Sequence, residues 1–529
     1  MHMRLTERFA KGLTGALFVL LVLFCLLTYR QHGISNDEEV QHIYGRLLLD
    51  FYGSFGADKS AFQYKNLYLY GGFFDVIAAA IERFGGMASP WETRHLLCAV
   101  FGLYGMWGVY SLAKLAGNAW VGFWAVLFLC VTGAWSGTLF THTKDVPFAA
   151  FMTWALYYSA RVLEDFPNLR LPMVLRLGAV VGCAFGLRVG ALFAVFYFGL
   201  GLVFCAWRSP NRVQSFRIAL LKALPGALPI FLLTAVFWPW VVQSPGNLLE
   251  AITSFSHFAF ELHTLLNGQD LLISDLPGDY LSLYLAVKLP ELVILGMVFA
   301  VSLACLNMRR CAYGQVAILA RVLTSLAFFF PVVYTLQAAP PLYNGLRHFT
   351  FVLPPACVLA ALGWWAVWRA CAHRQGVRCA LGAGAAVLFM MVAIPLYRLH
   401  PYTYAYFNQF AGGTRALGSG QWETDYWSSS LLEGSLALNA FIQKEAVPPK
   451  PWLVAVCAEA QQVSPYLDAR YFVISKDWYN ADFFLSGTHM SCDKAMQGKE
   501  IAMVTRADMT LAVVKDRRAL VTVQERTPR

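Results

Sequence analysis

Long apolar runs, separated by short polar stretches that carry Lys or Arg, follow one another along most of the chain. About eleven of these runs reach the length of about 17–25 mainly apolar residues that a helix needs to cross a bilayer. We therefore predict an α-helical polytopic membrane protein. The gap between the fifth and sixth runs is so short that they could form one broken helix. The expected segments are 12–29, 93–112, 119–139, 146–163, 172–188, 190–207, 223–243, 290–307, 316–336, 349–369 and 379–397.

The first apolar run has the basic start of a signal peptide but not its other features. Arg4, Arg8 and Lys11 precede an uncharged run from Gly12 to Tyr29. This run is longer than a typical signal core of about 7–15 residues, and no small-residue cleavage pattern follows it. We expect a retained membrane helix.

The Lys and Arg residues also predict the orientation of the chain. With the amino terminus in the cytoplasm, the cytoplasmic stretches contain sixteen of them, whereas the opposite loops before residue 398 contain ten over a greater length. Cytoplasmic loops of membrane proteins are enriched in these residues. The orientation predicts a transmembrane domain of residues 1–397, with outer loops 30–92 and 244–289, and an extracytoplasmic domain of residues 398–529.

Two of the outer regions are expected to contain secondary structure. In loop 30–92, the stretch FFDVIAAAIERF is too short and too charged to span, and is typical of a helix that lies along the membrane surface. After residue 398 the chain is too polar for membrane segments, and β-like runs occur in WLVAVCA, RYFVIS, EIAMVTR and TLAVVK. This region is predicted to form a small α/β domain.

Composition supports the membrane assignment and argues against a nucleic-acid-binding protein. Hydrophobic residues make up 58% of the 529 positions and charged residues only 14%, compared with about 25% charged in soluble domains. The net charge is +10, but the basic residues lie in short loops between apolar runs. That placement is typical of topology signals, so we expect membrane lipids and no nucleic acid as partners.

Most of the twelve cysteines lie inside apolar runs, without a CxxC pair, and are expected to be small core residues. Cys457 and Cys492 are the only two after residue 398. If that region lies outside the cytoplasm, two thiols in an oxidising compartment tend to join. We predict a Cys457–Cys492 disulfide; the alternative is two separate buried thiols.

The stretch GISNDEEVQHIYG has three consecutive acidic residues just after the first apolar run. Ser35 and Asn36 can cap a helix start, and acidic residues in a first turn favour the helix dipole. Helix capping therefore accounts for Glu38 and Glu39 better than for Asp37, since a cap needs only one carboxylate. At a membrane-facing cavity, loss of hydration raises a carboxylate pKa towards that of a useful base. Asp37 is therefore a candidate base.

The stretch THTKDVPF provides a second acidic candidate in a short outward turn. Asp145 stands beside Lys144 and ahead of Pro147, so it could simply cap the helix that follows. A functional role gains weight if Asp145 lies opposite Asp37, because both are predicted on the same side of the membrane.

The stretch YNGLRHF places Arg347 and His348 at the outer boundary of a predicted span, beside Tyr343 and Asn344. The simpler interpretation is that an Arg at such a boundary extends its side chain to the lipid headgroups and does nothing more. A guanidinium also binds phosphate oxygens in a bidentate manner, so the cluster is a candidate phosphate site. Arg188, in GLRVG, is a similar candidate at another outer helix end.

Metal binding remains an open alternative at this point. Glu39 with His42, and Glu92 with His95, have the Glu-x-x-His spacing of di-iron proteins. Both pairs lie in or beside an irregular loop rather than on one bundle, which argues against a membrane oxidase. Asp37 and Asp145 could share a divalent cation or act without one.

Four ordered stretches together resemble the GT-C class of membrane glycosyltransferases. They are NDEEVQHIYG, THTKDVPFAAFMTWALYYSARVLE, YNGLRHFTFVLPP and HPYTYAYFNQFAGG with the following WETDYWSSS. The resemblance is to the branch of dolichyl-phosphate-mannose protein mannosyltransferases and the lipid A aminoarabinose transferase. It implies transfer of a sugar, with inversion, from a polyprenyl-phosphate carrier to a hydroxyl of a glycan, lipid or protein outside the cytoplasm. It also implies a bacterial inner membrane protein with its active site facing the periplasm.

The resemblance also implies roles for the candidate residues. Asp37 is the expected base with Glu38 as its neighbour, and Asp145 is the second acidic residue of the site. The expected contacts to the donor phosphate are Arg347, His348, Arg188 and Lys144, and the expected further substrate contacts are His42, Tyr343 and Asn344. The chain lacks the large central-loop domain of the eukaryotic mannosyltransferases, which argues against a protein acceptor.

Two other classes of function are alternatives to the glycosyltransferase hypothesis. A transporter or flippase of lipid-linked sugars would also have many helices and boundary charges, but no paired broken helices in matching halves are evident in the sequence. A non-catalytic scaffold finds support only in the aromatic outer loops. Release of lipid phosphate from a labelled donor would separate the transferase from both.

Overall fold

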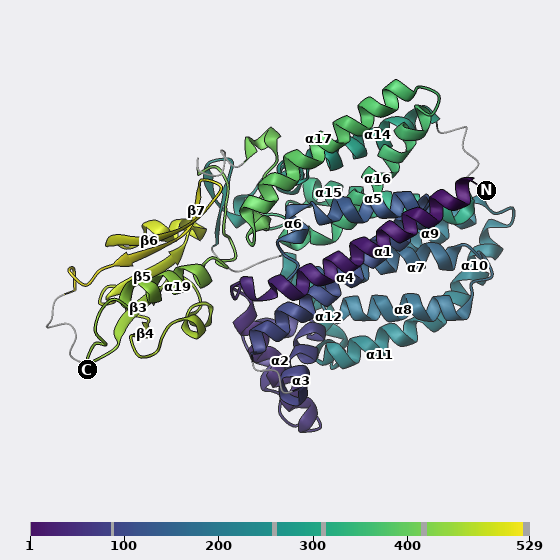
Figure 1. Cartoon of the computed structure of the whole chain (residues 1–529). Helices are drawn as coiled ribbons and strands as arrows, with labels where there is room; N and C mark the ends of the chain where they lie inside the picture. Colours follow the sequence, from purple (N-terminus) through teal and green to yellow (C-terminus); the bar gives the residue numbers. More distant parts are fainter. Residues whose placement is uncertain (1, 86–88, 257–261, 308–313, 414–419, 522–529) are drawn as a thin grey trace.

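The computed structural model of the chain describes residues 2–521 apart from 86–88, 257–261, 308–313 and 414–419 (Figure 1). Helices dominate, and each of the predicted apolar segments coincides with one. The long bundle helices are α1 (His2–Thr28), α4 (Pro90–Ala116), α5 (Ala119–Cys130), α7 (Asp145–Leu163), α8 (Leu171–Phe185), α9 (Leu192–Arg208), α10 (Arg212–Ala223), α11 (Ala227–Phe237), α14 (Glu291–Asn307), α15 (Gln315–Ala338), α16 (Leu353–Ala370) and α17 (Gln375–Leu399).

Not every helix of the bundle is long enough to cross a bilayer. Within the described ranges, seven helices meet the requirements of length and composition, or eight if α13 (Tyr280–Lys288) and α14, bent by 114°, form one span. Helices α5 and α8 have 12 and 15 residues, or about 18–22 Å at a rise of 1.5 Å per residue. The polytopic helical fold is therefore as predicted, but three of the eleven expected segments, those of α5, α7 and α8, are not among these spans.

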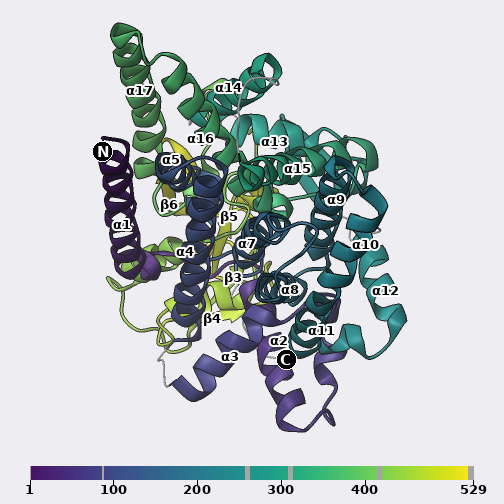
Figure 2. The same cartoon turned by 90° about the vertical axis from the view of Figure 1, so that its right-hand side faces the viewer.

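The centre of the bundle is α7. It lies between the other helices when the molecule is viewed from its end (Figure 2), and nearly all of its residues are buried, from Asp145 to Leu163. Small and apolar side chains allow this close packing against α4 and α8. The first residue of the central helix is thus the acidic residue of THTKDVPF, held at one end of the bundle.

The two loops predicted to lie outside the cytoplasm contain more secondary structure than the sequence suggested. Loop 30–92 forms α2 (Glu38–Gly53) and α3 (Phe73–Gly85), the latter matching the stretch expected at the membrane surface. Loop 244–289 contains α12 (Pro245–Ser256) and a hairpin of β1 (His263–Leu266) and β2 (Gln269–Leu272). The hairpin turns at Asn267-Gly268, both with positive φ, which is a strong hairpin signal that the sequence analysis missed.

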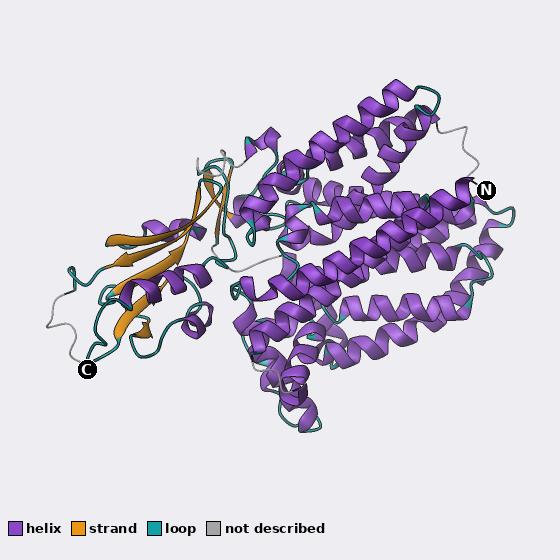
Figure 3. Ribbon diagram, viewed as in Figure 1, coloured by secondary structure: helices purple, strands orange, loops and turns teal. Residues whose placement is uncertain are grey.

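The carboxy-terminal region forms a five-stranded mixed sheet of order β4-β3-β5-β7-β6 beside α19 (Leu431–Ile442) (Figure 3). Four of its strands were expected. The fifth is the central β5, buried along its whole length; without the alternation of a half-buried strand, FFLSG carries little strand signal. The strands are β3 (Trp452–Val456), β4 (Phe472–Ser475), β5 (Phe483–Gly487), β6 (Lys499–Arg506) and β7 (Met509–Asp516).

The sheet lies at one end of the bundle, and the amino terminus of α1 lies at the other (Figure 1). The segment between α17 and α19 joins the two parts and is largely buried, with Tyr402, Tyr404, Tyr406, Phe407 and Trp427 at most 2% exposed. Aromatic residues of this size bury a large apolar area. The carboxy-terminal region is therefore packed onto the end of the bundle where the candidate residues gather.

Candidate active site

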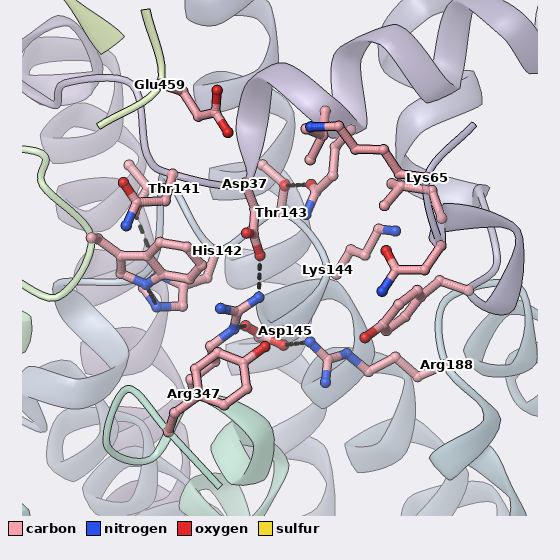
Figure 4. Close-up of a pocket in the computed structure, with 18 of the residues that line it drawn as sticks. Asp37, Lys65, Thr141, His142, Thr143, Lys144, Asp145, Arg188, Arg347 and Glu459 are labelled. Atoms are coloured by element: carbon pink, nitrogen blue, oxygen red, sulfur yellow. Dashed lines mark hydrogen bonds and ion pairs between the residues drawn. The ribbon is translucent and has the colours of Figure 1, made fainter. Parts of the chain in front are cut away.

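A cavity of about 410 Å³ opens at the end of the bundle next to the carboxy-terminal region. Its lining comes from parts of the chain that lie far apart in the sequence: residues between 36 and 41, between 65 and 70 and from 141 to 145, then Arg188, Leu262, Tyr343, Arg347, Trp427 and Glu459. Figure 4 shows the charged side chains converging on this space. The cavity is lined, among others, by Asp37, Lys144, Asp145, Arg188, Arg347 and Trp427.

Asp37 stands just before α2, but its side chain does not cap the helix. It makes no capping hydrogen bond and instead forms an ion pair with Arg347. The side chain of Asp37 is 32% exposed and that of Arg347 only 10%. The capping interpretation of Asp37 is therefore not what the structure shows: the carboxylate faces the cavity and a guanidinium from a segment 310 residues away.

Asp145 lies between two guanidinium groups. It is paired with Arg188, and its Oδ2 lies 3.8 Å from Nε of Arg347. The structure thus brings together Asp37, Asp145 and both arginines, as predicted if the two acidic residues face the same space. Opposite charges placed so closely in a mostly buried site hold one another in fixed positions.

Both arginines keep buried donors that are not used. The Nε atoms of Arg188 and Arg347 are buried and donate no hydrogen bond to any described residue. A guanidinium has five N–H donors and no acceptor, and leaving a buried donor unpaired is costly. Both arginines line the cavity, so its wall carries two guanidinium groups that each keep one N–H without a hydrogen bond among the described residues.

Lys144 adds a third cation beside them. Its Nζ lies 3.6 Å from Oδ2 of Asp75 and 4.7 Å from the ring centre of Tyr70. Burial lowers the pKa of Lys144 from its usual value, and the neighbouring Asp75 carboxylate opposes that shift. Asp75, on α3, is fully buried; its carboxylate also accepts a hydrogen bond from Arg94 (3.0 Å), and the two cations compensate for its burial.

Trp427 closes the cavity from the carboxy-terminal side. The guanidinium of Arg347 lies 4.3 Å from the centre of its ring, and its indole N–H donates to Nε2 of His142. The stretch WETDYWSSS contributes to the family resemblance, but this tryptophan was not predicted to have a role in the site. The only sign of a role in the sequence was an aromatic residue in a polar stretch. Its partner Arg347 lies in another segment, so the contact could not be predicted.

Glu38 lies behind the cavity rather than in it. Its carboxylate is fully buried, accepts a hydrogen bond from the backbone N–H of Ser35 (2.7 Å) and lies 3.3 Å from Nε2 of His95. Arg94 is 4.0 Å away. The predicted position of Glu38 beside the base is thus corrected: it caps and pairs inside the core, where a buried carboxylate needs such partners.

Three further candidates also stand outside the cavity lining of the described residues. His42 faces Glu82 on the far side of α2, with 3.5 Å between Nδ1 and Oε2. His348 packs its ring against Tyr343, 4.7 Å between centres, and Asn344 forms a turn with φ of 57°. Of the YNGLRHF cluster, only Tyr343 and Arg347 reach the cavity, because the turn points their neighbours elsewhere.

The arrangement of acidic residues does not match a di-iron centre. Over the described ranges, no group of three or more His, Cys, Asp or Glu side chains is placed to hold one metal ion. In the two Glu-x-x-His pairs, His42 faces Glu82 and His95 faces Glu38. Asp37 and Asp145 do not form a joint metal site as arranged, because the guanidinium of Arg347 is paired with both.

A disulfide joins Cys457 and Cys492, whose Cα atoms are 6.2 Å apart. It connects the residue after β3 to the segment between β5 and β6. Glu459, two residues after Cys457, lines the cavity mouth.

Comparison with known proteins identifies the central part of the bundle. Residues 84–240 match the dolichyl-phosphate-mannose-protein mannosyltransferase family. The matched region is under a third of the chain and contains Lys144, Asp145 and Arg188, but not Asp37 or Arg347. The expected resemblance to membrane glycosyltransferases is thus confirmed by this match. No curated protein matches the chain in sequence.

Three solved structures have a partly similar course of the chain. ArnT from Cupriavidus metallidurans in the apo state is 15% identical over 97% of this chain and 99% of its own, with a TM-score of 0.47. ArnT bound to undecaprenyl phosphate has a TM-score of 0.46, with 15% identity over 98% of this chain and 100% of its own. The apo oligosaccharyltransferase of Archaeoglobus fulgidus has a TM-score of 0.48, with 11% identity over 90% of this chain and 69% of its own. All three TM-scores are below 0.5, too low for the likeness to indicate a function.

Proposed function

We propose that this membrane protein is an inverting glycosyltransferase that moves a sugar from a polyprenyl-phosphate carrier to a hydroxyl acceptor outside the cytoplasm. The observation that carries the proposal is one cavity lined by Asp37 and by two arginines, in which Arg347 is paired with Asp37 and Arg188 with Asp145. A transfer of this kind needs one base for a hydroxyl and several donors for a departing phosphate. The family match of residues 84–240 supports the same class of reaction.

The donor phosphate is proposed to bind between Arg347, Arg188 and Lys144. Charge-assisted hydrogen bonds from guanidinium groups to phosphate oxygens are short and strong, and their planar fork fixes the orientation of the phosphate. Asp145, paired with both arginines, holds them at a fixed separation. This assigns Asp145 a positioning role rather than contact with the sugar.

The proposed reaction is a single displacement at the anomeric carbon. The acceptor oxygen forms the new bond to that carbon, its proton passes to the carboxylate of Asp37, and the bond between the anomeric carbon and the phosphate oxygen breaks. The electron pair of that bond leaves with the polyprenyl phosphate, whose charge the cations stabilise. Inversion follows because the base and the departing phosphate act on opposite faces of the sugar, as in inverting glycosidases.

No metal ion takes part in this scheme. The two carboxylates that could share a divalent cation are both paired with Arg347, so the donor set does not fit a metal bridge in this arrangement. The guanidinium supplies the positive charge that a metal would otherwise bring to the phosphate.

The cavity is proposed to open to the extracytoplasmic side, which in a bacterial inner membrane is the periplasm. The Lys and Arg distribution supports this orientation, and the cavity lies at the end of the bundle away from the amino terminus (Figure 1). A lipid carrier reaches such a site from the bilayer, and the acceptor, a glycan, lipid or protein, from the aqueous side.

The test is release of lipid phosphate from a labelled donor. Purified protein in lipid nanodiscs is incubated with a panel of labelled polyprenyl-phosphate sugars and an extract containing candidate acceptors, and polyprenyl phosphate is quantified. Release that depends on Asp37 supports the transferase. Movement of intact labelled donor across a vesicle membrane, without bond cleavage, would instead support a flippase and contradict the proposal.

A further inference from the structure

The strongest unassigned feature is the contact that the carboxy-terminal region makes with Arg347. Trp427 is 2% exposed, and it belongs to the segment after α17, the last bundle helix. Its ring covers one face of the Arg347 guanidinium, with 4.3 Å between the guanidinium carbon and the ring centre. A cation over an indole face is attracted by the ring quadrupole, and more strongly when water is excluded.

The backbone around Trp427 is held by a buried carboxylate. Asp425 accepts hydrogen bonds from the backbone N–H groups of Ser429 (3.2 Å) and Ser430 (3.1 Å), and a further one from the hydroxyl of Tyr404. Ser428 adopts a left-handed conformation, with φ of 54°, which is unusual for a residue other than glycine. A tight turn with this many fixed donors gives Trp427 one orientation rather than several.

The other edge of the indole is held by His142. The indole N–H can only donate, so Nε2 of His142 must be the accepting, unprotonated nitrogen. The proton of the neutral ring is then on Nδ1, which lies 3.4 Å from the hydroxyl oxygen of Thr141. Trp427 is therefore fixed on both sides, by a neutral histidine at its edge and by the turn of its own segment.

We propose that Trp427 is a positioning residue for donor binding, which acts by fixing the guanidinium of Arg347 in the plane that faces the phosphate. The ring covers one face of the guanidinium, so its N–H donors are directed to acceptors in its plane: Asp37, Asp145 and the incoming phosphate. The carboxy-terminal region is thereby part of the donor site. This inference rests on the proposed phosphate-binding role of Arg347.

The experiment measures binding of a fluorescent polyprenyl monophosphate to the full-length protein in nanodiscs, which requires knowledge of neither the sugar nor the acceptor. Trp427→Leu removes the ring face and should weaken binding about tenfold, in line with a desolvated cation–π contact. Trp427→Phe keeps a ring face and should recover most of the affinity. Recovery by Phe, despite loss of the indole N–H, would show that the ring face matters for the phosphate.

The matched control is Trp422→Leu. Trp422 is also buried, at 5% exposed, and packs on Phe407 and Tyr284 with ring centres 5.5 Å apart in both contacts, but it does not line the cavity. Its loss should leave phosphate affinity within about twofold. Equal losses of affinity in Trp422→Leu and Trp427→Leu would overturn the positioning role, since both would then reflect packing alone.

A double mutant separates this inference from the proposed function. If Trp427 acts through Arg347, then Trp427→Leu should have little further effect in an Arg347→Lys background, because interacting residues are not additive. A full additional tenfold loss there would refute the coupling. Unchanged affinity in Arg347→Lys itself would refute the proposed phosphate site, whereas normal affinity in Trp427→Leu and Trp427→Phe, with Arg347→Lys impaired, would refute only the role of Trp427.

Discussion

Replacing Asp37 by Asn should separate the chemical step from donor binding. The change keeps the shape of the side chain and removes the group that is proposed to accept the proton. Loss of a positioned general base lowers turnover by about 10²–10⁴-fold, or about 3–5 kcal/mol of barrier at 1.36 kcal/mol for each factor of ten. We expect turnover of Asp37→Asn at or below about 1% of wild type.

The ion pair with Arg347 adds a second, less obvious expectation. The carboxylate of Asp37 is paired with Arg347, so it competes with the phosphate for the donors of that guanidinium. A neutral amide is a weaker acceptor than a carboxylate. Asp37→Asn should therefore bind a polyprenyl monophosphate as tightly as wild type or more tightly, although it turns over slowly.

The assay measures lipid-phosphate release under single-turnover conditions and binding of the monophosphate separately. Glu39→Gln is the control within the same motif: the carboxylate of Glu39 faces the backbone of Gln461 and the side chain of Glu459 rather than Arg347. It should retain turnover within about threefold. Normal turnover in Asp37→Asn, or a tenfold loss of its phosphate affinity, would refute the assignment of Asp37.

Four other changes follow from the same structure. Arg347→Ala should weaken phosphate binding by about 1.5–3 kcal/mol in the monophosphate binding assay. Unchanged affinity would show that Arg347 does not bind the phosphate. Glu38→Gln should lower thermal stability, since breaking a buried ion pair costs about 3–5 kcal/mol, but should leave turnover per folded molecule near wild type. Unchanged stability together with lost turnover would show instead that Glu38 takes part in the reaction. Burial raises the pKa of Glu423 from 4.5 to about 7, so the folded protein favours the protonated acid. The free energy of unfolding should therefore fall by about 3 kcal/mol as pH rises from 4.5 to 7. Glu423→Gln should reduce this dependence of thermal stability on pH, and an unchanged dependence would contradict the prediction. Reduction of Cys457–Cys492 should cost about 3–4 kcal/mol, and non-reducing mass spectrometry that finds two free thiols in protein from its native membrane would argue against the bond and the outward placement.

The order of the helices and the character of the two parts were evident in the sequence. Runs of apolar residues predicted the helices, because backbone groups in a bilayer must bond within their own segment. The β-like runs after residue 398 predicted the sheet. Span length was less certain: whether a run such as 172–188 crosses a bilayer depends on where its helix ends, and α8 ends at Phe185.

The candidate residues were only partly resolved by sequence. Asp37, Asp145, Arg188 and Arg347 could be selected because a charge beside a membrane helix needs a reason. The sequence favoured Asp37 over Glu38 as the base, because a helix cap explains Glu38 better, but it left Glu38 beside Asp37 in the site. Helix geometry decides between them: Glu38 is the first residue of α2 and turns into the core, while Asp37 precedes the helix and faces Arg347.

Tertiary structure alone decided which distant segments meet. The pairing of Asp37 with Arg347 joins positions 310 residues apart, and Trp427 reaches the same guanidinium from beyond the last bundle helix. No local pattern encodes such contacts, because they depend on how the bundle packs and on how the carboxy-terminal region is placed against its end. The sequence by itself determined the apolar helices and the types of side chain available, and it predicted an orientation from the Lys and Arg residues; packing determined which of those side chains share one cavity.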